Sequence, residues 1–140
     1  MQQSDLNLFR DSLARVTARD GFFDSFYDHF ISQSDEIAAI FLHRDMDQIK
    51  SKLRSTLEMV ARTAEDQSGI QLYMEMLGRI HQRLHVERRH FDMWQVALLD
   101  TVAVYDEAYS DRVGAAWSQV IGTVIELFFS ALHQPRKLAS

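Results

Sequence analysis

Three residues stand at spacings that suit metal chemistry: Tyr27, Phe41 and His81. Phe41 follows Tyr27 by 14 positions (41 − 27) and precedes His81 by 40 (81 − 41). A neutral imidazole can ligate iron, a phenol donates a hydrogen bond, and a phenylalanine offers an apolar wall. Around one pocket these groups suit a flat iron-bearing cofactor such as haem. The plainer alternatives are a solvated or satisfied histidine, a core tyrosine and simple packing.

Composition limits the kind of protein that holds these residues. The chain has 140 residues, enough for one domain, with a formal net charge of −5 and no cysteine. This charge gives no general attraction to nucleic acid or anionic membrane, and the lack of cysteine excludes disulfides and thiolate metal sites. We expect no secretory signal in the first residues, which carry acids, and no apolar run approaches the roughly 20 residues of a membrane span. We expect a cytoplasmic protein without nucleic-acid or membrane partners.

Apolar residues recur at intervals of three and four, which predicts helices. One proline and five glycines leave little to punctuate strands. Ser4 and Asp35 are candidate N-caps, and 65–69 is an expected loop. Seven helical segments are predicted: 4–18, 20–32, 35–41, 45–64, 70–84, 87–106 and 111–132. The pattern predicts one all-α domain over residues 1–140, with a disordered tail at about 134–140, although periodicity alone also fits a four-helix bundle.

Two stretches of the sequence resemble bacterial globins. SFYDHFISQSDEIAAIF (25–41) is similar to the second and third helices of single-domain haemoglobins and of the haem domains of flavohaemoglobins. LGRIHQRLHVERRHF (77–91) resembles the proximal segment, where an aromatic residue, here Phe91, follows the ligand histidine by ten positions. The resemblance implies a globin fold of about seven helices around haem b (iron protoporphyrin IX), with His81 as the iron ligand.

On the proximal side, the resemblance implies an apolar approach to a flat macrocycle. Leu77 precedes His81 by one turn and Ile80 lies beside it, and Leu72 and Met76 are expected on the same stripe. His85, one turn after His81, resembles the histidine that hydrogen-bonds a haem propionate; a solvated residue at a helix end is the equal alternative.

On the distal side, Tyr27 is implied to donate to a bound gas and Phe41 to pack on the porphyrin. Position 49, which lies 32 before His81 (81 − 32), is usually glutamine in bacterial globins and histidine in animal ones, but here it is Ile49. Gln48 is adjacent, yet one residue turns a helical side chain by about 100°. Leu53 fits the second apolar distal residue. This register predicts one polar donor, Tyr27, against an apolar wall.

Lys52 lies three residues past Ile49, near the expected mouth of the pocket. It reads as a solvated lysine, a propionate partner or an amine that occupies the sixth iron site. His43 and Met46 in the preceding loop are weaker candidates for reaching inward.

Other metal and phosphate chemistries fit poorly. Glu87 and His90 form a single ExxH pair, whereas a di-iron bundle needs that motif from each of two helices. No glycine-rich phosphate loop and no HExxH motif occur. The arginines of 79–90 read as a solvated face or a propionate rim.

The resemblance implies reversible binding of a diatomic gas at haem iron, for oxygen binding, transport or storage, with nitric oxide and carbon monoxide as further ligands. One alternative is a haem-based gas sensor acting on a signalling domain. Another is a nitric oxide dioxygenase served by a separate reductase; the glutamate that flavohaem domains carry late in the last helix has no counterpart around Leu132. A globin fold without haem is a fourth reading, against which Tyr27 and His81 argue.

Overall fold

The computed structural model describes residues 2–65, 67–82 and 86–133, with the backbone alone at 67, 82 and 131–133. Within this part of the chain every regular element is a helix, which confirms the predicted all-α fold of about seven helices. The helices are α1 (Gln3–Thr17), α2 (Phe22–Ser32), α3 (Asp35–Phe41), α4 (Met46–Thr63), α5 (Gln67–Gln82), α6 (Arg88–Tyr105) and α7 (Asp111–His133). His85 and the predicted tail at 134–140 lie outside the described residues.

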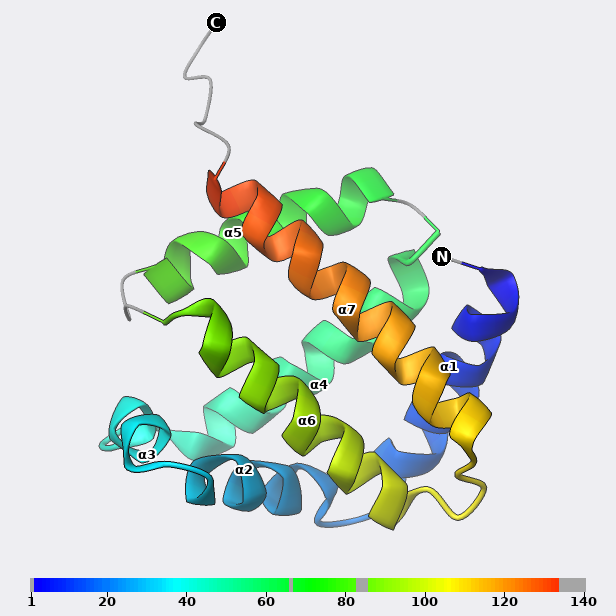
Figure 1. The fold of residues 1–140 in the computed structure, drawn as a ribbon, viewed down its shortest axis with the longest axis horizontal. Coiled ribbons are helices and arrows are strands. Elements are labelled where there is room, and N and C mark those ends of the chain that lie inside the picture. Colours follow the sequence, from blue (N-terminus) through cyan, green and yellow to red (C-terminus); the bar gives the residue numbers. More distant parts are fainter. Residues whose placement is uncertain (1, 66, 83–85, 134–140) are drawn as a thin grey trace, which may run out of the picture.

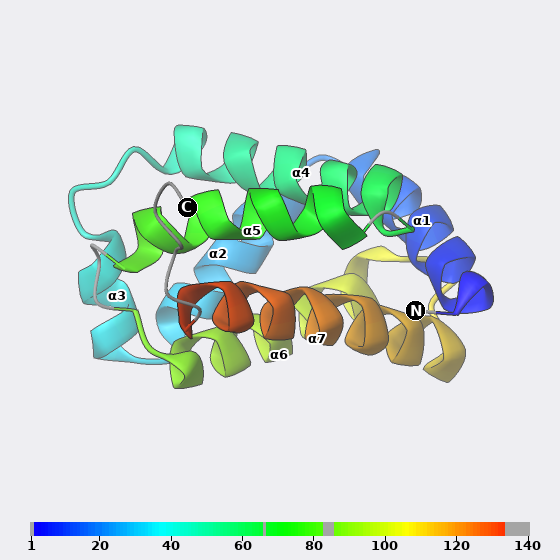
Figure 2. The ribbon, with the colours of Figure 1, turned by 90° about the horizontal axis from the view of Figure 1, so that it is seen from above.

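The helices form two layers around one interior (Figures 1 and 2). Helices α6 and α7 lie side by side in one layer, and α4 and α5 lie in the other. Both α1 and α5 pack on α7, while α2 packs on α6 and α3 packs on α2. Consequently the helix that carries His81 rests on α7, and the helix that carries Tyr27 rests on α6.

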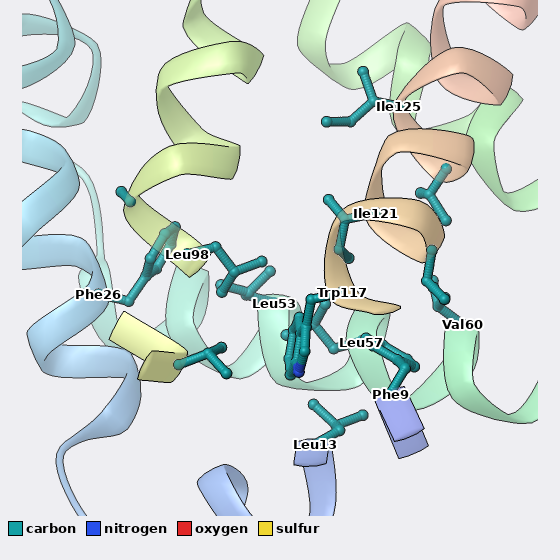
Figure 3. Packing of buried hydrophobic residues seen from close by; sticks show 14 of the residues in the cluster. Phe9, Leu13, Phe26, Leu53, Leu57, Val60, Leu98, Trp117, Ile121 and Ile125 are labelled. Atoms are coloured by element: carbon teal, nitrogen blue, oxygen red, sulfur yellow. The ribbon is translucent and has the colours of Figure 1, made fainter. Parts of the chain in front are cut away.

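Apolar side chains from five helices fill the interior (Figure 3). Phe9 comes from α1, Phe26 from α2, Leu57 from α4, Leu98 from α6 and Trp117 from α7, and each is no more than 1% exposed. The Phe9 and Trp117 rings meet edge to face with centroids 4.7 Å apart. Burial of such large side chains stabilises a helix packing by about 1.5–3 kcal/mol per residue, so this core fixes where the polar residues lie.

Most helix ends lie within two residues of the sequence prediction, and three helix starts differ from it in their caps or by more. Ser4 lies inside α1 rather than capping it, since Gln2 occupies the N-cap position. The cap of α3 is Ser34, whose hydroxyl accepts the Ile37 N–H at 3.0 Å, and not Asp35. Helix α5 begins at Gln67, within the predicted loop. Polar residues at a helix start are compatible with several neighbouring cap positions, and packing decides which one is used.

The expected apolar stripe on α5 is wrong at three of its four residues. Leu72 is 69% exposed, Met76 47% and Ile80 49%, and only Leu77 is partly buried against the core. The buried face is formed by Ile70 and Met74 instead. Apolar residues occur on both sides of this helix, so spacing alone could not tell the inner face from the outer one.

One helix has a stretch, Asp111–Ser130, that length and composition would allow to cross a membrane, which the sequence prediction did not anticipate. It belongs to α7, whose apolar residues Val113, Trp117, Val120 and Ile121 are all buried against other helices. A central core helix that packs on three others, here α1, α5 and α6, is expected to be this apolar, so the packing accounts for its composition.

Candidate functional site

His81 is held near the end of α5 as a neutral, oriented imidazole. Its Nδ1 lies 2.8 Å from the Leu77 carbonyl oxygen. A carbonyl only accepts, so Nδ1 carries the proton and donates it, and Nε2 keeps its lone pair. Burial lowers the pKa of His81, and the bond to Leu77 offsets this only in part. The ring therefore presents an unprotonated nitrogen, the form that ligates iron.

Two phenylalanines surround the His81 ring. Its centroid lies 5.7 Å from that of Phe91 at the start of α6 and 5.5 Å from that of Phe128 on α7. Phe91 and Phe128 also contact each other at 4.8 Å. Three helices thus enclose the imidazole in aromatic surface, and the only polar contact found to the ring in the described residues is the Leu77 carbonyl.

Tyr27 lies on α2 in a second aromatic cluster. It is 6% exposed, and its ring meets Phe26 edge-on at 4.8 Å and Phe41 at 5.7 Å. Phe41, the last residue of α3, also packs on Phe30 at 5.8 Å. No hydrogen-bond partner of the Tyr27 hydroxyl is found among the described residues. Burial raises the pKa of this phenol, so it stays protonated and can donate a hydrogen bond.

Helix α4 turns its apolar residues inward beside these groups. Leu53 is buried, Ile49 is partly buried against the core, and Gln48 is exposed. Asp45 caps the helix by accepting the Gln48 N–H at 3.2 Å. This orientation fits the register in which Ile49, and not Gln48, faces the interior.

The weaker distal candidates occupy different surroundings. Lys52 is exposed and forms no ion pair within the described residues, whereas Lys50 Nζ lies 2.8 Å from Asp24 Oδ1. Met46 is partly buried against the core. His43 is exposed, with a left-handed φ of 66° that turns the chain between α3 and α4.

Helix α6 joins the two aromatic clusters. Trp94 contacts Phe26, the neighbour of Tyr27, with centroids 6.1 Å apart, and Phe91, one turn earlier, contacts His81. Three residues along a helix advance the axis by about 4.5 Å. The Tyr27 and His81 clusters therefore lie at the same end of α6, near the point where α5 ends and α6 begins (Figure 1).

The comparisons with known proteins agree with this arrangement. The Globin family model matches residues 24–127, a range that includes Tyr27, His81 and Phe91. The chain belongs to the globin family. It is also similar to protein PA3967 from Pseudomonas aeruginosa PAO1, whose crystal structure is described as structurally highly homologous to a human hemoglobin. That similarity has a TM-score of 0.85 at 31% identity and covers 93% of this chain and 99% of the other. The comparison with curated proteins found no match.

Globins generally bind haem, and two features of this globin fit that cofactor. The Nδ1–H of His81 is committed to the Leu77 carbonyl, which leaves Nε2 for a metal, and this is the usual arrangement of a metal-ligating histidine. Tyr27 is a buried residue whose hydroxyl has no hydrogen-bond partner among the described residues, so its O–H is available to donate to a ligand.

Sequence reasoning missed Phe128 as a neighbour of His81 and Trp94 as the contact to Phe26. Both were recognisable as core residues from their helical spacing. Their partners depend on how α6 and α7 cross the other helices, which no spacing within one helix reports.

A second titratable cluster joins α3 to the start of α6. Oxygen and nitrogen atoms of Glu36, Glu87 and His90 come within 4.8 Å of one another, which resembles a metal site. However, His90 Nδ1 accepts the Glu87 backbone N–H at 2.9 Å and Nε2 lies 3.1 Å from Glu36. Arg89 pairs with both carboxylates. Each residue of the cluster is already engaged and the Arg89 guanidinium is paired with both acids, so we assign the cluster to helix packing.

Two arginines of 79–90, Arg88 and Arg89, are engaged in similar contacts. Arg88 pairs with Glu126 and lies over the Phe129 ring, with its guanidinium carbon 5.0 Å from the centroid. Arg79 is exposed, and Arg83 lies outside the described residues. Of the predicted readings, the contacts of Arg88 and Arg89 fit a solvated, ion-paired face.

A surface hollow of about 560 Å³ lies away from both clusters, between the end of α1 and the α6–α7 joint. Two arginines line it. Arg15 binds Asp106, and Arg19 donates to the Tyr105 carbonyl at 2.8 Å. With both guanidiniums engaged, this hollow presents no free cation to a ligand.

Proposed function

We propose that this globin binds haem b through His81 and reversibly binds a diatomic gas, principally oxygen. The observation that supports this proposal most directly is the hydrogen bond from His81 Nδ1 to the Leu77 carbonyl, with the ring surrounded by Phe91 and Phe128. When bound, haem iron supplies a site at which oxygen, nitric oxide or carbon monoxide binds reversibly. The proposed cofactor contacts are His81, Leu77 and Phe91 on one side and Tyr27, Phe41, Ile49 and Leu53 on the other.

In this proposal each residue of the site has a separate role. His81 supplies the nitrogen ligand, and the Leu77 carbonyl fixes its tautomer and ring plane. Tyr27 offers one hydrogen bond to the partial negative charge on a bound diatomic ligand. Ile49 and Leu53 exclude water from the same side, because neither can hydrogen-bond to it.

The surroundings of His81 favour gas binding over redox turnover. Enzymatic haem sites often strengthen their proximal histidine with a carboxylate. Here the partner is a backbone carbonyl and the ring neighbours are Phe91 and Phe128. Glu126, the nearest acid before the end of α7, pairs instead with Arg88. Oxygen binding for storage or transport is therefore our first proposal, ahead of nitric oxide dioxygenation with a separate reductase.

Absorption spectra of the purified protein test this function. We expect an intense Soret band, and we expect His81→Ala to lose the five-coordinate ferrous spectrum because no neutral nitrogen replaces the imidazole. His29→Ala is the matched control, since His29 is an exposed histidine of α2 paired with Asp100. A folded but colourless protein after haem addition, or native spectra in His81→Ala, would contradict the proposal.

A further inference from the structure

Three large apolar side chains form an exposed row on α5. Leu72, Met76 and Ile80 are 69%, 47% and 49% exposed and follow one another at four-residue intervals, so they share one face of the helix. Figure 2, viewed from above, shows that no other helix lies in front of α5. Single exposed apolar residues are normal in proteins, but a contiguous row indicates an interaction surface.

Other exposed apolar residues among the described ones do not form such a row. Val96 and Val104 both lie on α6, but the exposed Asp100 separates them. Leu42 and Tyr109 lie in two different joints between helices. The α5 row, defined as Leu72, Met76 and Ile80, is the place where exposed apolar surface gathers along one element.

Two opposite charges border the α5 row on one side. Glu75 and Arg79 lie one turn apart on the same side of the α5 row, and Arg79 is exposed. Neither has an ion-pair partner among the described residues, although most other arginines in this part of the chain are paired. The face thus combines an apolar centre with one unpaired acid and one unpaired base.

We infer that this face binds the same face of a second copy of the chain, with the two α5 helices antiparallel. A twofold axis near Met76 places Leu72 opposite Ile80 of the other copy and Met76 opposite itself. The same axis brings Glu75 within about 3 Å, measured along the helix, of the other copy's Arg79, because two residues span that rise. One operation therefore matches the apolar row and forms two Glu75–Arg79 pairs between the copies.

The charge pattern favours this occupant over others. In a twofold-symmetric parallel pair of α5 helices, Glu75 and Arg79 of one copy would lie on the opposite side of the apolar row from those of the other copy, so neither charge would meet its opposite. A different protein would need an acid, a base and an apolar row in complementary order, whereas a second copy already carries them. The contact would lie beside His81 without using its nitrogens, so the inference does not depend on haem binding.

Sedimentation velocity over a range of concentrations tests the dimer. We expect the unmodified chain to shift from monomer to dimer as concentration rises, and we expect Met76→Glu to remain monomeric, because two carboxylates would face each other at the axis. Val104→Glu is the matched control: it makes the same chemical change at a position that is 75% exposed on α6. It should dimerise like the unmodified chain.

Charge reversal gives a sharper test of the antiparallel geometry. Glu75→Arg leaves two bases on each copy and Arg79→Glu leaves two acids, so each variant alone should be monomeric. Mixed together they should associate, since every cross-pair is then opposite, and the double variant should also recover the dimer. Circular dichroism verifies folding in each case.

Three results would overturn the inference: a monomer at all concentrations, dimers unaffected by Met76→Glu, or single reversals that dimerise as well as the unmodified chain. The Soret band is read separately from mass, so failure of the dimer and failure of the haem proposal are distinguishable.

Discussion

At the residue scale, the chemistry of this globin depends on how two side chains are held. Burial lowers the pKa of His81 and raises the pKa of Tyr27, so both groups are neutral near pH 7. Their hydrogen-bonding states differ, however. The His81 ring is anchored by the Leu77 carbonyl, whereas the Tyr27 hydroxyl has no partner in the described part of the chain. An anchored acceptor nitrogen and a free donor are the combination that a gas-binding haem site requires.

Replacing Tyr27 with phenylalanine tests the role of that free donor. If the hydroxyl donates to bound oxygen, its loss removes a hydrogen bond of about 1.5–3 kcal/mol. We therefore expect Tyr27→Phe to speed oxygen dissociation roughly ten-fold or more, since 1.4 kcal/mol corresponds to about a factor of ten. Stopped-flow measurement of the dissociation rate gives the answer.

Folding should change little in Tyr27→Phe, because the hydroxyl stabilises no contact found within the described residues. Tyr109→Phe, in the α6–α7 joint, is the control that removes a remote phenol. An unchanged dissociation rate in Tyr27→Phe would assign Tyr27 to packing.

Spacing along the chain was enough to nominate these residues, because Tyr27, Phe41 and His81 are set on helices whose lengths can be read from periodicity. The structure places Tyr27 against Phe41 and His81 against Phe91. Spacing along the chain does not by itself predict either of these ring contacts. The contact between Phe128 and His81 could not be predicted from spacing, because 47 residues separate them (128 − 81) and only the packing of α5 on α7 brings them together.

At the element scale, the sequence pattern predicted which segments are helical. It did not always predict which face of a helix is buried. On α4 and α7 polar residues occupy one face, so the apolar stripe identified the core side correctly. On α5 apolar residues lie on both faces, and the row Leu72, Met76 and Ile80 was assigned to the interior although it is exposed. A helix that covers the core with one face and binds a partner with another carries apolar residues on both faces. Its sequence pattern therefore does not show which face is buried.

The cap of α3 makes a prediction at this scale. Ser34 accepts the Ile37 N–H, and α3 ends in Phe41, which packs on Tyr27. Loss of an N-cap hydroxyl costs about 1 kcal/mol, so Ser34→Ala should lower the midpoint of thermal unfolding by roughly 2–4 °C.

Asp35→Ala is the matched comparison for this cap and should cost less, because Asp35 is the first helical residue and not the cap. Differential scanning calorimetry measures the midpoint of thermal unfolding of both variants. A larger fall in the unfolding midpoint for Asp35→Ala than for Ser34→Ala would support Asp35 as the cap, as the sequence pattern predicted.

At the scale of the whole molecule, a buried polar network links three helices far from the proposed haem site. Asp106, at the end of α6, accepts hydrogen bonds from Arg15 Nε at 2.6 Å and Ser12 Oγ at 2.5 Å on α1. Trp117 on α7 donates to the same Ser12 oxygen at 2.8 Å. The carboxylate is fully buried, so it stabilises the fold only while charged and bonded to these donors.

The acid dependence of stability follows from the pKa of Asp106. Burial alone raises this pKa, but the hydrogen bonds from Arg15, Ser12 and the Ala108 N–H outweigh it and hold the pKa below the ordinary value of 3.8. As the pH falls, the unfolded chain takes up this proton before the folded one. The contribution of Asp106 is therefore complete above about pH 4 and is lost as the pH drops through the folded pKa.

Asp106→Asn should thus lower the free energy of unfolding by about 3 kcal/mol at pH 7, while its difference from the unmodified chain should shrink below about pH 4. Urea unfolding followed by circular dichroism between pH 7 and pH 3 measures both effects. Asp100→Asn, at an exposed acid of the same helix, should show neither. The absorption spectrum should stay unchanged in both variants, because Asp106 lies at the end of α6 opposite His81. A difference that is constant with pH would show that the network's polar shape, and not its charge, stabilises the fold.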